Sequence, residues 1–469
     1  MKETVLRIQN CYSWLYCEKP SVLSVLHENM RFRERGYFHS RLYKQKLWDG
    51  YTEFFSKKTG RFLTGLLPEV KAALAHIGQE YRVLDERGEF DFRFEEIDED
   101  FLGGGIKLYD YQVDLTNALI KYKRGVICAP TGAGKTLIML SILKALPEGT
   151  PTLVLANKKS LVQQNYEEIA QYGFKSVGRL YGKYKEPNVI TCSTVQSLHK
   201  IEPLLEKVKV LIVDEIHENM SKEPKKYFNK MKSCSVRAAV SATPFKFGGK
   251  DLCQKWLVKG YFGPALKAKR AGGTLTTSHL QERGTLSKSK CVFYPVREPD
   301  LKYEIYMDAV TRGIAENWHF LEMVKRLVMS LEGRTLILVE RIAQGDSLSS
   351  LIPGSLWVQG KDDLDTRKMV IEKLKSSKEK VTALSTQQIF TAGINVMVHN
   401  VINAAGGQAD HHIIQRVGRG LRTAADKDIL NYYDFVFHNN DYLLEHSKKR
   451  IKILKKEGHE IVIKDEVDF

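Results

Sequence analysis

Two short stretches of the sequence carry side chains suited to phosphate chemistry, and the first is APTGAGKT at residues 129–136. The pattern predicts a strand that ends at Ala129 and a helix that begins near Lys135, which is the setting of a phosphate-binding loop. Glycines allow the backbone N–H groups to point at a phosphate, and the helix N-terminus adds positive charge. Lys135 can then reach the β- and γ-phosphates, and the Thr136 hydroxyl can ligate Mg²⁺. The predicted nucleotide-binding residues of this loop are Thr131, Gly132, Ala133, Gly134, Lys135 and Thr136.

The second stretch is VDEIH at residues 213–217, which follows the apolar run VKVLI. Ligands of open α/β sheets bind at the carboxyl edge of the strands, so Asp214 is predicted to hold the Mg²⁺. Glu215 is predicted to position or deprotonate the attacking water. Two acids at a strand end, taken alone, usually form a solvated cap. Together with the phosphate loop they complete a site that hydrolyses a nucleoside triphosphate.

A third stretch, QRVGRGLR at residues 415–422, places three arginines within two helical turns. Arg419 and Arg422 are three residues apart and therefore share a helix face. An isolated arginine cluster is most often a solvated or nucleic-acid-facing helix. Beside a nucleotide site, these arginines are predicted to act as arginine fingers that complete the phosphate site from across a cleft, a role that contributes on the order of 10³ to 10⁵ in rate. A cleft that closes on ATP and opens after hydrolysis is a motor.

The elements that must position these residues alternate between apolar strands and amphipathic helices. Between residues 106 and 245 the candidate strands are GVICAP, PTLVLA, NVITC, KVLIVDE and RAAVSAT. After residue 300 they are RTLILVE, SLWVQG, KVTALS, HNVINAA and NYYDFVF, with a helix at DTRKMVIEKLKSS. Strands that alternate with helices predict parallel, doubly wound sheets, so the fold class is α/β with two lobes. Residues 246–300 are predicted to be irregular.

The N-terminal part has a different composition. Residues 1–84 are rich in aromatic and basic side chains, and glycines punctuate short runs that suggest small strands, hence an α+β domain. The acidic stretch 85–101 and the glycines at 103–105 mark a candidate boundary. We therefore predict three parts: an N-terminal DNA-binding domain at 1–100, a first lobe at 101–295 and a second lobe at 296–469.

The overall charge favours an anionic polymer as partner. The 469 residues carry a formal net charge of +16, and lysines and arginines bind nucleic acid through phosphate contacts and counterion release. A basic surface kept for solubility is the alternative. The seven cysteines are scattered without metal-ligand spacing, and no apolar run is long enough to span a membrane. These features predict a soluble, cytoplasmic protein that acts away from membranes.

The order of the motifs resembles helicase superfamily 2 in its DExH form. APTGAGKT resembles motif I, DEIH motif II, SATP (241–244) motif III, RTLILVER motif IV, TAGIN (391–395) motif V and QRVGRGLR motif VI. The resemblance covers about residues 106–425 and implies two tandem RecA-like lobes with ATP and Mg²⁺ between them. In motif V, Ala392 and Asn395 replace acidic residues that many relatives carry, so coupling at this motif is less defined.

The resemblance also implies roles for single residues. Tyr109 and Gln112 in YDYQ would read the adenine, and Gln415 would lie near the attacking water, beside Arg419 and Arg422 at the γ-phosphate. The residues implied to couple hydrolysis to strand contact are His217, Ser241, Thr243 and Gly393. The residues implied to contact the nucleic-acid backbone are Lys159, Thr194 and Gln196.

Within this superfamily the chain resembles the phage recombination and fork-remodelling helicases of the UvsW type. The likeness rests on a compact second lobe and on KLWDGYTEFFSKKTGRFLTGLLPEV in the first domain, where Lys46 and Trp48 would contact DNA. It implies branch migration, fork regression and unwinding of junctions in phage-type recombination, repair or replication. Basic groups there can neutralise phosphates while aromatic rings stack on exposed bases. An aromatic core with an ordinary basic surface is the alternative.

Two other functions remain open from the sequence. One is a different motor of the superfamily: an RNA helicase, or a duplex DNA translocase that serves restriction or repair. The other is a DNA-binding protein with an idle nucleotide fold, which the combination of Lys135, Asp214, Glu215, Arg419 and Arg422 argues against. The sequence leaves the polarity of movement, the preferred junction and the oligomeric state undefined, although a monomer is compatible with it.

Overall fold

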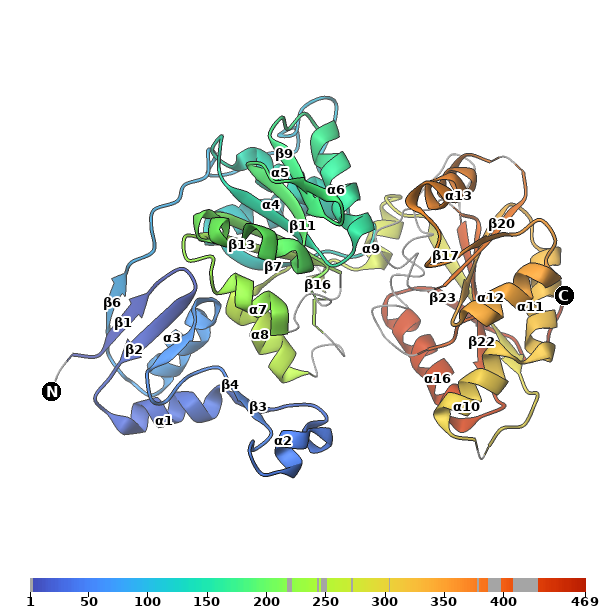
Figure 1. Ribbon diagram of the computed structural model, residues 1–469, viewed down its shortest axis with the longest axis horizontal. Coiled ribbons are helices and arrows are strands. Elements are labelled where there is room, and N and C mark those ends of the chain that lie inside the picture. Colours follow the sequence, from blue (N-terminus) through green and yellow to red (C-terminus); the bar gives the residue numbers. More distant parts are fainter. Residues whose placement is uncertain are drawn as a thin grey trace. The chain divides into compact units, whose positions relative to one another are not determined.

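The structure is a computed structural model, and its chain divides into two compact units (Figure 1). The first unit comprises Met1–Ala129 and Gly134–Thr274, and the second comprises Leu275–Phe469 with Pro130–Ala133. The residues that the structure describes are 3–216, 222–242, 244–245, 251–270, 273–302, 304–377, 379–386, 398–407 and 429–469. In that part of the chain no helix is long and apolar enough to cross a membrane.

The first unit begins with a small α+β domain. Its four-stranded sheet has the order β5-β2-β1-β6, in which β1 is antiparallel to β2 and parallel to β6. Apolar side chains alternate along β1 and β2, so that one face of the sheet is buried. The elements are β1 (Val5–Ile8), β2 (Tyr12–Tyr16), α1 (Pro20–Asn29), β5 (Arg61–Leu63), η2 (Thr64–Leu66), α3 (Leu67–His76) and β6 (Arg82–Asp85).

Residues 31–53 form a projection from this domain that we call the arm. Its base is an antiparallel ribbon of β3 (Arg31–Arg33) and β4 (Tyr51–Glu53). Its outer part holds the short helices η1 (Tyr37–His39) and α2 (Arg41–Lys44). Figure 1 shows the arm extending away from the four-stranded sheet.

The rest of the first unit is a doubly wound lobe around an eight-stranded sheet of order β10-β9-β11-β8-β12-β13-β7-β14. Its strand pairs are parallel except that of β9 with β10. The five strands predicted in this region are confirmed. The strands are β7 (Arg124–Cys128), β8 (Thr152–Ala156), β9 (Val177–Tyr181), β10 (Tyr184–Glu186), β11 (Ile190–Thr194), β12 (Val210–Asp214), β13 (Val236–Ser241) and β14 (Ala265–Leu266). The helices are α4 (Asp110–Tyr122), α5 (Lys135–Ala145), α6 (Lys159–Gln171), η3 (Val195–Lys207), α7 (Lys222–Phe228) and α8 (Leu252–Phe262).

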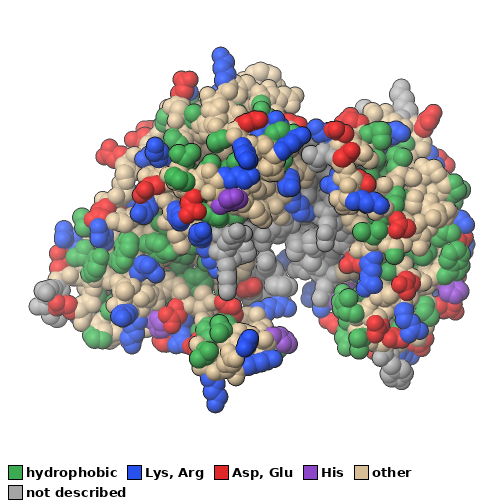
Figure 2. Space-filling view, in the orientation of Figure 1, with side chains coloured by type: hydrophobic (Ala, Val, Ile, Leu, Met, Phe, Trp, Pro, Cys, Tyr) green, Lys and Arg blue, Asp and Glu red, His purple; other side chains and the backbone are tan. Residues whose placement is uncertain are grey.

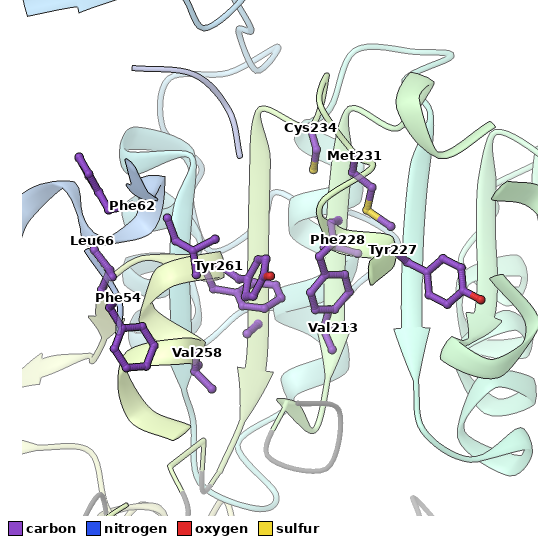
Figure 3. Packing of buried hydrophobic residues seen from close by; sticks show 14 of the residues in the cluster. Phe54, Phe62, Leu66, Val213, Tyr227, Phe228, Met231, Cys234, Val258 and Tyr261 are labelled. Carbon is purple, nitrogen blue, oxygen red and sulfur yellow. The ribbon is translucent and has the colours of Figure 1, made fainter. Parts of the chain in front are cut away.

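One hydrophobic core joins the small domain to this lobe. Figure 3 shows Phe54 and Leu66 of the small domain beside Val258 and Tyr261 of α8, and the packing continues to Phe228. Because close packing of this kind resists sliding, the small domain is a fixed extension of the lobe.

Polar contacts reinforce the same junction. The buried Arg124 guanidinium donates to the carbonyl oxygens of Asn10 and, at 3.2 Å, of Tyr261. Lys259 and Glu69 form an ion pair at 2.6 Å. Helix α8 therefore links the small domain to the lobe by both kinds of contact.

The second unit contains a second α/β lobe, with a seven-stranded sheet of order β19-β20-β18-β21-β22-β17-β23. Its strand pairs are all parallel. The five strands predicted after residue 300 are confirmed, as is the helix at DTRKMVIEKLKSS. The strands are β17 (Lys288–Val296), β18 (Arg334–Val339), β19 (Leu356–Val358), β20 (Val381–Thr386), β21 (Asn400–Asn403), β22 (Ile429–Phe437) and β23 (Glu460–Ile463). The helices are α9 (Thr277–Glu282), α10 (Tyr306–Val310), the π-helical turn η6 (Thr311–Ala315), α11 (Trp318–Ser330), α12 (Ile342–Leu351), α13 (Leu364–Ser376) and α16 (Asp441–Lys456).

A buried ion pair lies at the centre of this second lobe. Arg450 of α16 donates to both carboxylate oxygens of Asp434, and neither side chain is more than 1% exposed. The same carboxylate accepts from the Asn403 amide at 2.9 Å, and Arg450 also donates to the carbonyl of Gly407 at 3.0 Å. The pair thus ties α16 to the chain at the carboxyl end of β21.

Three features differ from the sequence prediction or add to it. The prediction of an irregular segment at 246–300 is wrong for most of its length, because α8, α9 and β17 form there, with the short strands β15 (Lys269–Arg270) and β16 (Gly273–Thr274). The acidic stretch packs on the first lobe, where Ile97 is 6% exposed and its N–H donates to the Asn117 side chain at 2.8 Å. The boundary predicted between 295 and 296 falls within β17, and the three-part division stays a prediction.

Candidate ATP site and nucleic-acid surface

The sheet of the first lobe lines up the predicted site residues along its carboxyl edge. Side by side, β7 leads into the phosphate loop, β13 ends at Ser241 and β12 ends at Asp214. The next strands in the sheet are β8, which is followed by Lys159, and β11, which ends at Thr194. Ligands of such sheets bind at this edge. The half formed by β7, β13 and β12 suits a nucleotide, and the half formed by β8 and β11 suits a different ligand.

The phosphate loop has the backbone that its glycines allow. Gly132 and Gly134 have φ angles of +82° and +72°, a region that side chains with a Cβ rarely adopt. Gly134 is the N-cap of α5, whose first residues are Lys135 and Thr136, and the Ala133 N–H donates to Pro130 O at 3.1 Å. The Thr131 hydroxyl is buried without a hydrogen-bond partner among the described residues. The loop therefore presents backbone and hydroxyl groups at a helix N-terminus.

Lys135, Glu215 and Ser241 meet at this edge. The Lys135 ammonium donates to Glu215 Oε1 at 2.6 Å, and the Ser241 hydroxyl donates to Glu215 Oε2 at 2.9 Å. The side chains of the ion pair are only 19% and 15% exposed. Glu215 has a φ of +48°, an uncommon value for a residue with a side chain. The three predicted residues thus form one connected group, in which both carboxylate oxygens of Glu215 are held.

Asp214 lies next to this group in an environment that disfavours its charge. Burial and the neighbouring Glu215 carboxylate raise the pKa of Asp214 to about 7, against a smaller opposing effect of Lys135. A divalent cation would restore the ionised form. Thr136 and Asp214 supply a hydroxyl and a carboxylate, which are oxygen ligands of the kind Mg²⁺ accepts together with phosphates and water. The donor chemistry therefore fits the predicted metal.

The predicted adenine-reading residues lie against the phosphate loop. Gln112 is 1% exposed, and its Oε1 accepts from the Tyr109 N–H at 2.9 Å in a capping box of α4. A Cβ on Gly134 would lie 2.3 Å from Gln112 Nε2, so this position of the loop requires glycine. Tyr109 is 42% exposed and stacks on Tyr111 with ring centroids 5.6 Å apart. One face of an exposed aromatic ring is thus available beside the loop.

The predicted nucleic-acid contacts of the first lobe differ in their exposure. Lys159 is exposed at the first position of α6, and Gln196 is exposed at the start of η3. Thr194 is only 5% exposed, and its hydroxyl pairs with that of Ser197 at 3.0 Å. All three lie at the carboxyl edge, and their contact with nucleic acid stays a prediction. Lys183 and Lys200 lie at the same edge and were not singled out from the sequence. The sequence signal for a hairpin at this position is the Gly-Lys dipeptide between two tyrosines.

The arm contains a pocket at the predicted contacts Lys46 and Trp48. The pocket has a volume of about 630 Å³. The Trp48 indole is half-buried, and its N–H donates to Tyr51 O at 2.7 Å, so the ring is fixed. Lys46 has a φ of +57°. The residues that line the pocket are Phe38, Tyr43, Lys44, Lys46, Leu47, Trp48 and Asp49.

The remaining predicted site residues lie outside the described part of the chain. They are His217, Thr243, Gly393, Gln415, Arg419 and Arg422. Their roles stay predictions.

Sequence comparison relates this chain to known DNA helicases and translocases. The family model described as "Type III restriction enzyme, res subunit" matches residues 105–246, which contain motifs I to III. The DNA 3'-5' translocase XPB2 of Sulfurisphaera tokodaii is 26% identical over 362 residues, which cover 69% of this chain and 80% of that protein. The ATP-dependent DNA helicase uvsW of Enterobacteria phage T4 is 21% identical over 393 residues, which cover 76% of each. These matches confirm the resemblance that the motif order predicts.

The chain is similar to superfamily 2 helicases over most of its length. A solved structure of an S. cerevisiae Dbp5 variant bound to RNA and ADP–BeF₃ agrees at the level of the fold. It aligns with a TM-score of 0.51 at 15% identity, over 78% of this chain and 96% of that one. The helicase therefore has the two RecA-like lobes that were predicted, preceded by the small α+β domain, and it is an ATP-dependent enzyme.

Proposed function

We propose that this helicase uses ATP hydrolysis to move on DNA and to remodel branched DNA, through branch migration, fork regression and unwinding of junctions. The observation that carries the proposal is the arm: an aromatic and basic surface fixed to the first motor lobe. A junction presents phosphates and unpaired bases together, and these suit cations and aromatic faces respectively. The proposed setting is phage-type recombination, repair or replication in the cytoplasm of a host cell.

The contacts within the arm support a preformed surface. The Arg31 guanidinium lies 4.2 Å from the Tyr51 ring centroid, and that of Arg33 lies 4.9 Å from the rings of both Tyr37 and Tyr51. Leu47 is 74% exposed at the pocket. Stacked cations and rings lose little conformational entropy on binding. Arg31 is already ion-paired with Glu28 at 3.3 Å and with Asp49 at 2.8 Å, so the charge offered to an anionic ligand comes from Arg33 and from the lysines of the arm.

The base of the arm rests on α8, so movement of the motor lobe would carry the arm with it. Phe32 packs on Trp256 of α8 with ring centroids 4.9 Å apart, and Phe54 lies 6.0 Å from the same ring. The Cys253 thiol donates to Phe32 O at 3.2 Å. Helix α8 follows motif III in the chain. We infer that force produced at the ATP site reaches the junction through this helix.

In the hydrolysis step that we propose, Lys135 binds the β- and γ-phosphates; Thr136 and Asp214 would hold Mg²⁺, which would supply positive charge beside the phosphates. Glu215 orients the attacking water, and Ser241 keeps the Glu215 carboxylate in position. Arg419 and Arg422 would complete the γ-phosphate site from the second lobe, with Gln415 near the water. ATP binding requires Lys135 to leave Glu215, which frees this carboxylate for the water.

A second candidate function is translocation on duplex DNA without preference for branches. The similarity to the DNA 3'-5' translocase XPB2 favours it. The two candidates predict different substrates, because a duplex translocase does not need an element that recognises unpaired bases at a junction.

The experiment that tests the proposal compares three DNA substrates of equal length: a four-way junction, a replication-fork mimic and a simple tailed duplex. Lys135→Ala serves as the inactive control, and Lys44→Gln with Lys46→Gln alters the arm. We expect the branched substrates to be resolved at least tenfold faster than the tailed duplex, and the arm variant to lose most of this preference. Equal rates on all three substrates would contradict branch specialisation, and ATP hydrolysis stimulated more by RNA than by DNA would contradict a DNA track.

A further inference from the structure

Two arginines face each other in the core of the first unit. Strands β7 and β13 are neighbours in the eight-stranded sheet, and Arg124 and Arg237 are direct partners in their register, so both side chains lie on one face. Arg124 is 6% exposed and Arg237 is 0% exposed. Figure 2 shows that Lys and Arg side chains on the visible surface lie among Asp and Glu side chains. Like charges directly opposite each other destabilise a sheet, and burial increases this cost.

The hydrogen bonds of the two guanidinium groups leave donors of Arg237 unused. The Arg124 guanidinium donates to two carbonyl oxygens at the junction with the small domain. Arg237 Nη2 donates to the carbonyl oxygens of Phe228 at 3.1 Å and Met231 at 3.0 Å. Arg237 Nε and Nη1 are buried and have no hydrogen-bond partner among the described residues. A guanidinium carries N–H groups on all three nitrogens, so these two nitrogens can still bind an acceptor.

The protein groups around the two arginines do not neutralise them. Within the described part of the chain, no carboxylate forms an ion pair with either arginine. Two buried thiols lie nearby, and each donates to a carbonyl oxygen: Cys11 to Phe228 O at 3.8 Å and Cys234 to Val236 O at 3.2 Å. Burial raises the pKa of Cys234, against a smaller opposing effect of the arginines. A thiol that donates keeps its proton, so neither cysteine supplies a negative charge.

The pair therefore has the properties of a buried anion site. Burial and the neighbouring Arg237 charge lower the pKa of Arg124 to about 9, so both arginines are charged at neutral pH. We propose that Arg124 and Arg237 bind a small inorganic anion of the chloride type, with Arg237 Nε and Nη1 as its donors. A monatomic anion suits this close-packed core, whereas an oxyanion would need more space and more donors. The inference does not depend on the proposed function.

The position of the site indicates what the anion would do. Figure 3 shows Phe228, Met231, Cys234 and Tyr261 packed together in this core, and Arg124 donates from it to the carbonyl oxygen of Tyr261 in α8. Because the anion would screen the repulsion between the two arginines, it would stabilise the junction that fixes the small domain and the arm to the lobe. A ligand that binds only the folded state stabilises it in proportion to the logarithm of its concentration above the dissociation constant.

The direct test is diffraction from crystals of the full chain grown or soaked in bromide, which scatters anomalously and replaces chloride. We expect an anomalous peak within hydrogen-bonding distance of Arg237 Nε or Nη1. Bromide peaks at the protein surface without one at Arg237 would overturn the proposal. This result also decides the case if a variant of the buried arginine fails to fold.

The test in solution compares thermal unfolding of the full chain in sodium chloride and in sodium gluconate of equal ionic strength. We expect the folding equilibrium constant to rise about tenfold for each tenfold increase in chloride above its dissociation constant. Arg237→Met should abolish the difference between the two salts. Arg179→Met is the matched control, because Arg179 lies in the same sheet and is paired with Glu186, and this variant should keep the difference. Equal unfolding of the wild type in both salts, or a full chloride effect in Arg237→Met, would overturn the proposal.

Discussion

The ion pair between Lys135 and Glu215 leads to a prediction for ATP binding as well as for hydrolysis. In the structure the phosphate-binding lysine is held by the carboxylate that would orient the attacking water, at 2.6 Å. We infer that the ATP phosphates compete with Glu215 for the Lys135 ammonium. Glu215→Gln removes the charge and keeps the size of the side chain. We expect this variant to bind ATP more tightly than the wild type while losing hydrolysis.

The size of the effect follows from the ion pair. A hydrogen bond to a charged partner contributes about 1.5–3 kcal/mol, and the low exposure of both side chains limits screening by salt. A glutamine at 215 still offers a neutral oxygen to Lys135, so only part of this free energy is recovered. A gain of about 1.4 kcal/mol corresponds to about tenfold tighter binding of ATP. Loss of the water-orienting carboxylate should lower kcat by at least 10².

Binding of a fluorescent ATP analogue and single-turnover hydrolysis measure the two effects separately. Ser241→Ala is the matched control, because it removes the second hydrogen bond of Glu215 and leaves the ion pair with Lys135 in place. We expect that variant to bind ATP like the wild type and to hydrolyse it more slowly. Unchanged or weaker ATP binding by Glu215→Gln would refute competition for Lys135, and rapid turnover by it would refute the assignment of Glu215 to the water.

Three further predictions concern other parts of the first unit. Lys135→Ala should abolish ATP hydrolysis and leave DNA affinity within about twofold, as phosphate release and fluorescence anisotropy would measure. The pKa of Asp214 is higher in the folded protein than in the unfolded chain, so the folded protein binds more protons between about pH 4 and about pH 7. The free energy of unfolding, measured without nucleotide and Mg²⁺, therefore falls as the pH rises across this range. Asp214→Asn has no carboxyl group to titrate at this position, so the melting temperature of the variant minus that of the wild type should increase from about pH 4 to about pH 7. A constant difference would contradict the raised pKa of Asp214. Trp256→Ala should lower the free energy of unfolding by about 2 kcal/mol and reduce junction processing far more than DNA-stimulated ATP hydrolysis; an equal loss of both would argue against coupling through α8.

Much of the motor could be predicted from the sequence because its signals are local. Buried parallel strands are continuous apolar runs, so β7, β12 and β18 are recognisable without knowledge of their neighbours. The phosphate loop is equally local, since its glycines and Lys135 act within one turn of the backbone. The strand β17 and helix α8 were missed because neither shows a clear period: β17 is buried along most of its length but contains Pro295, and α8 contains Gly260.

The acidic stretch before the first lobe illustrates a different limit. Its charge suggested an exposed boundary, whereas Phe92, Ile97 and Phe101 belong to a small apolar cluster with α4 and α5. The cluster depends on which helices lie beside the stretch, and a charge count contains no information on this. The packing of Trp256 on the arm has the same origin, because Phe32 and Trp256 are more than two hundred residues apart in the chain.

The sequence by itself determined the chemistry of this protein: the phosphate loop, the acids of motif II, the basic charge and the order of motifs that marks a superfamily 2 helicase. The tertiary structure decided which of these groups touch. Strand order in a parallel sheet is set by crossover connections and by long-range packing, which leave no local signature. The order of the first sheet brought Ser241 to Glu215 and placed Glu215 against Lys135. It also set Arg124 directly opposite Arg237 in the core.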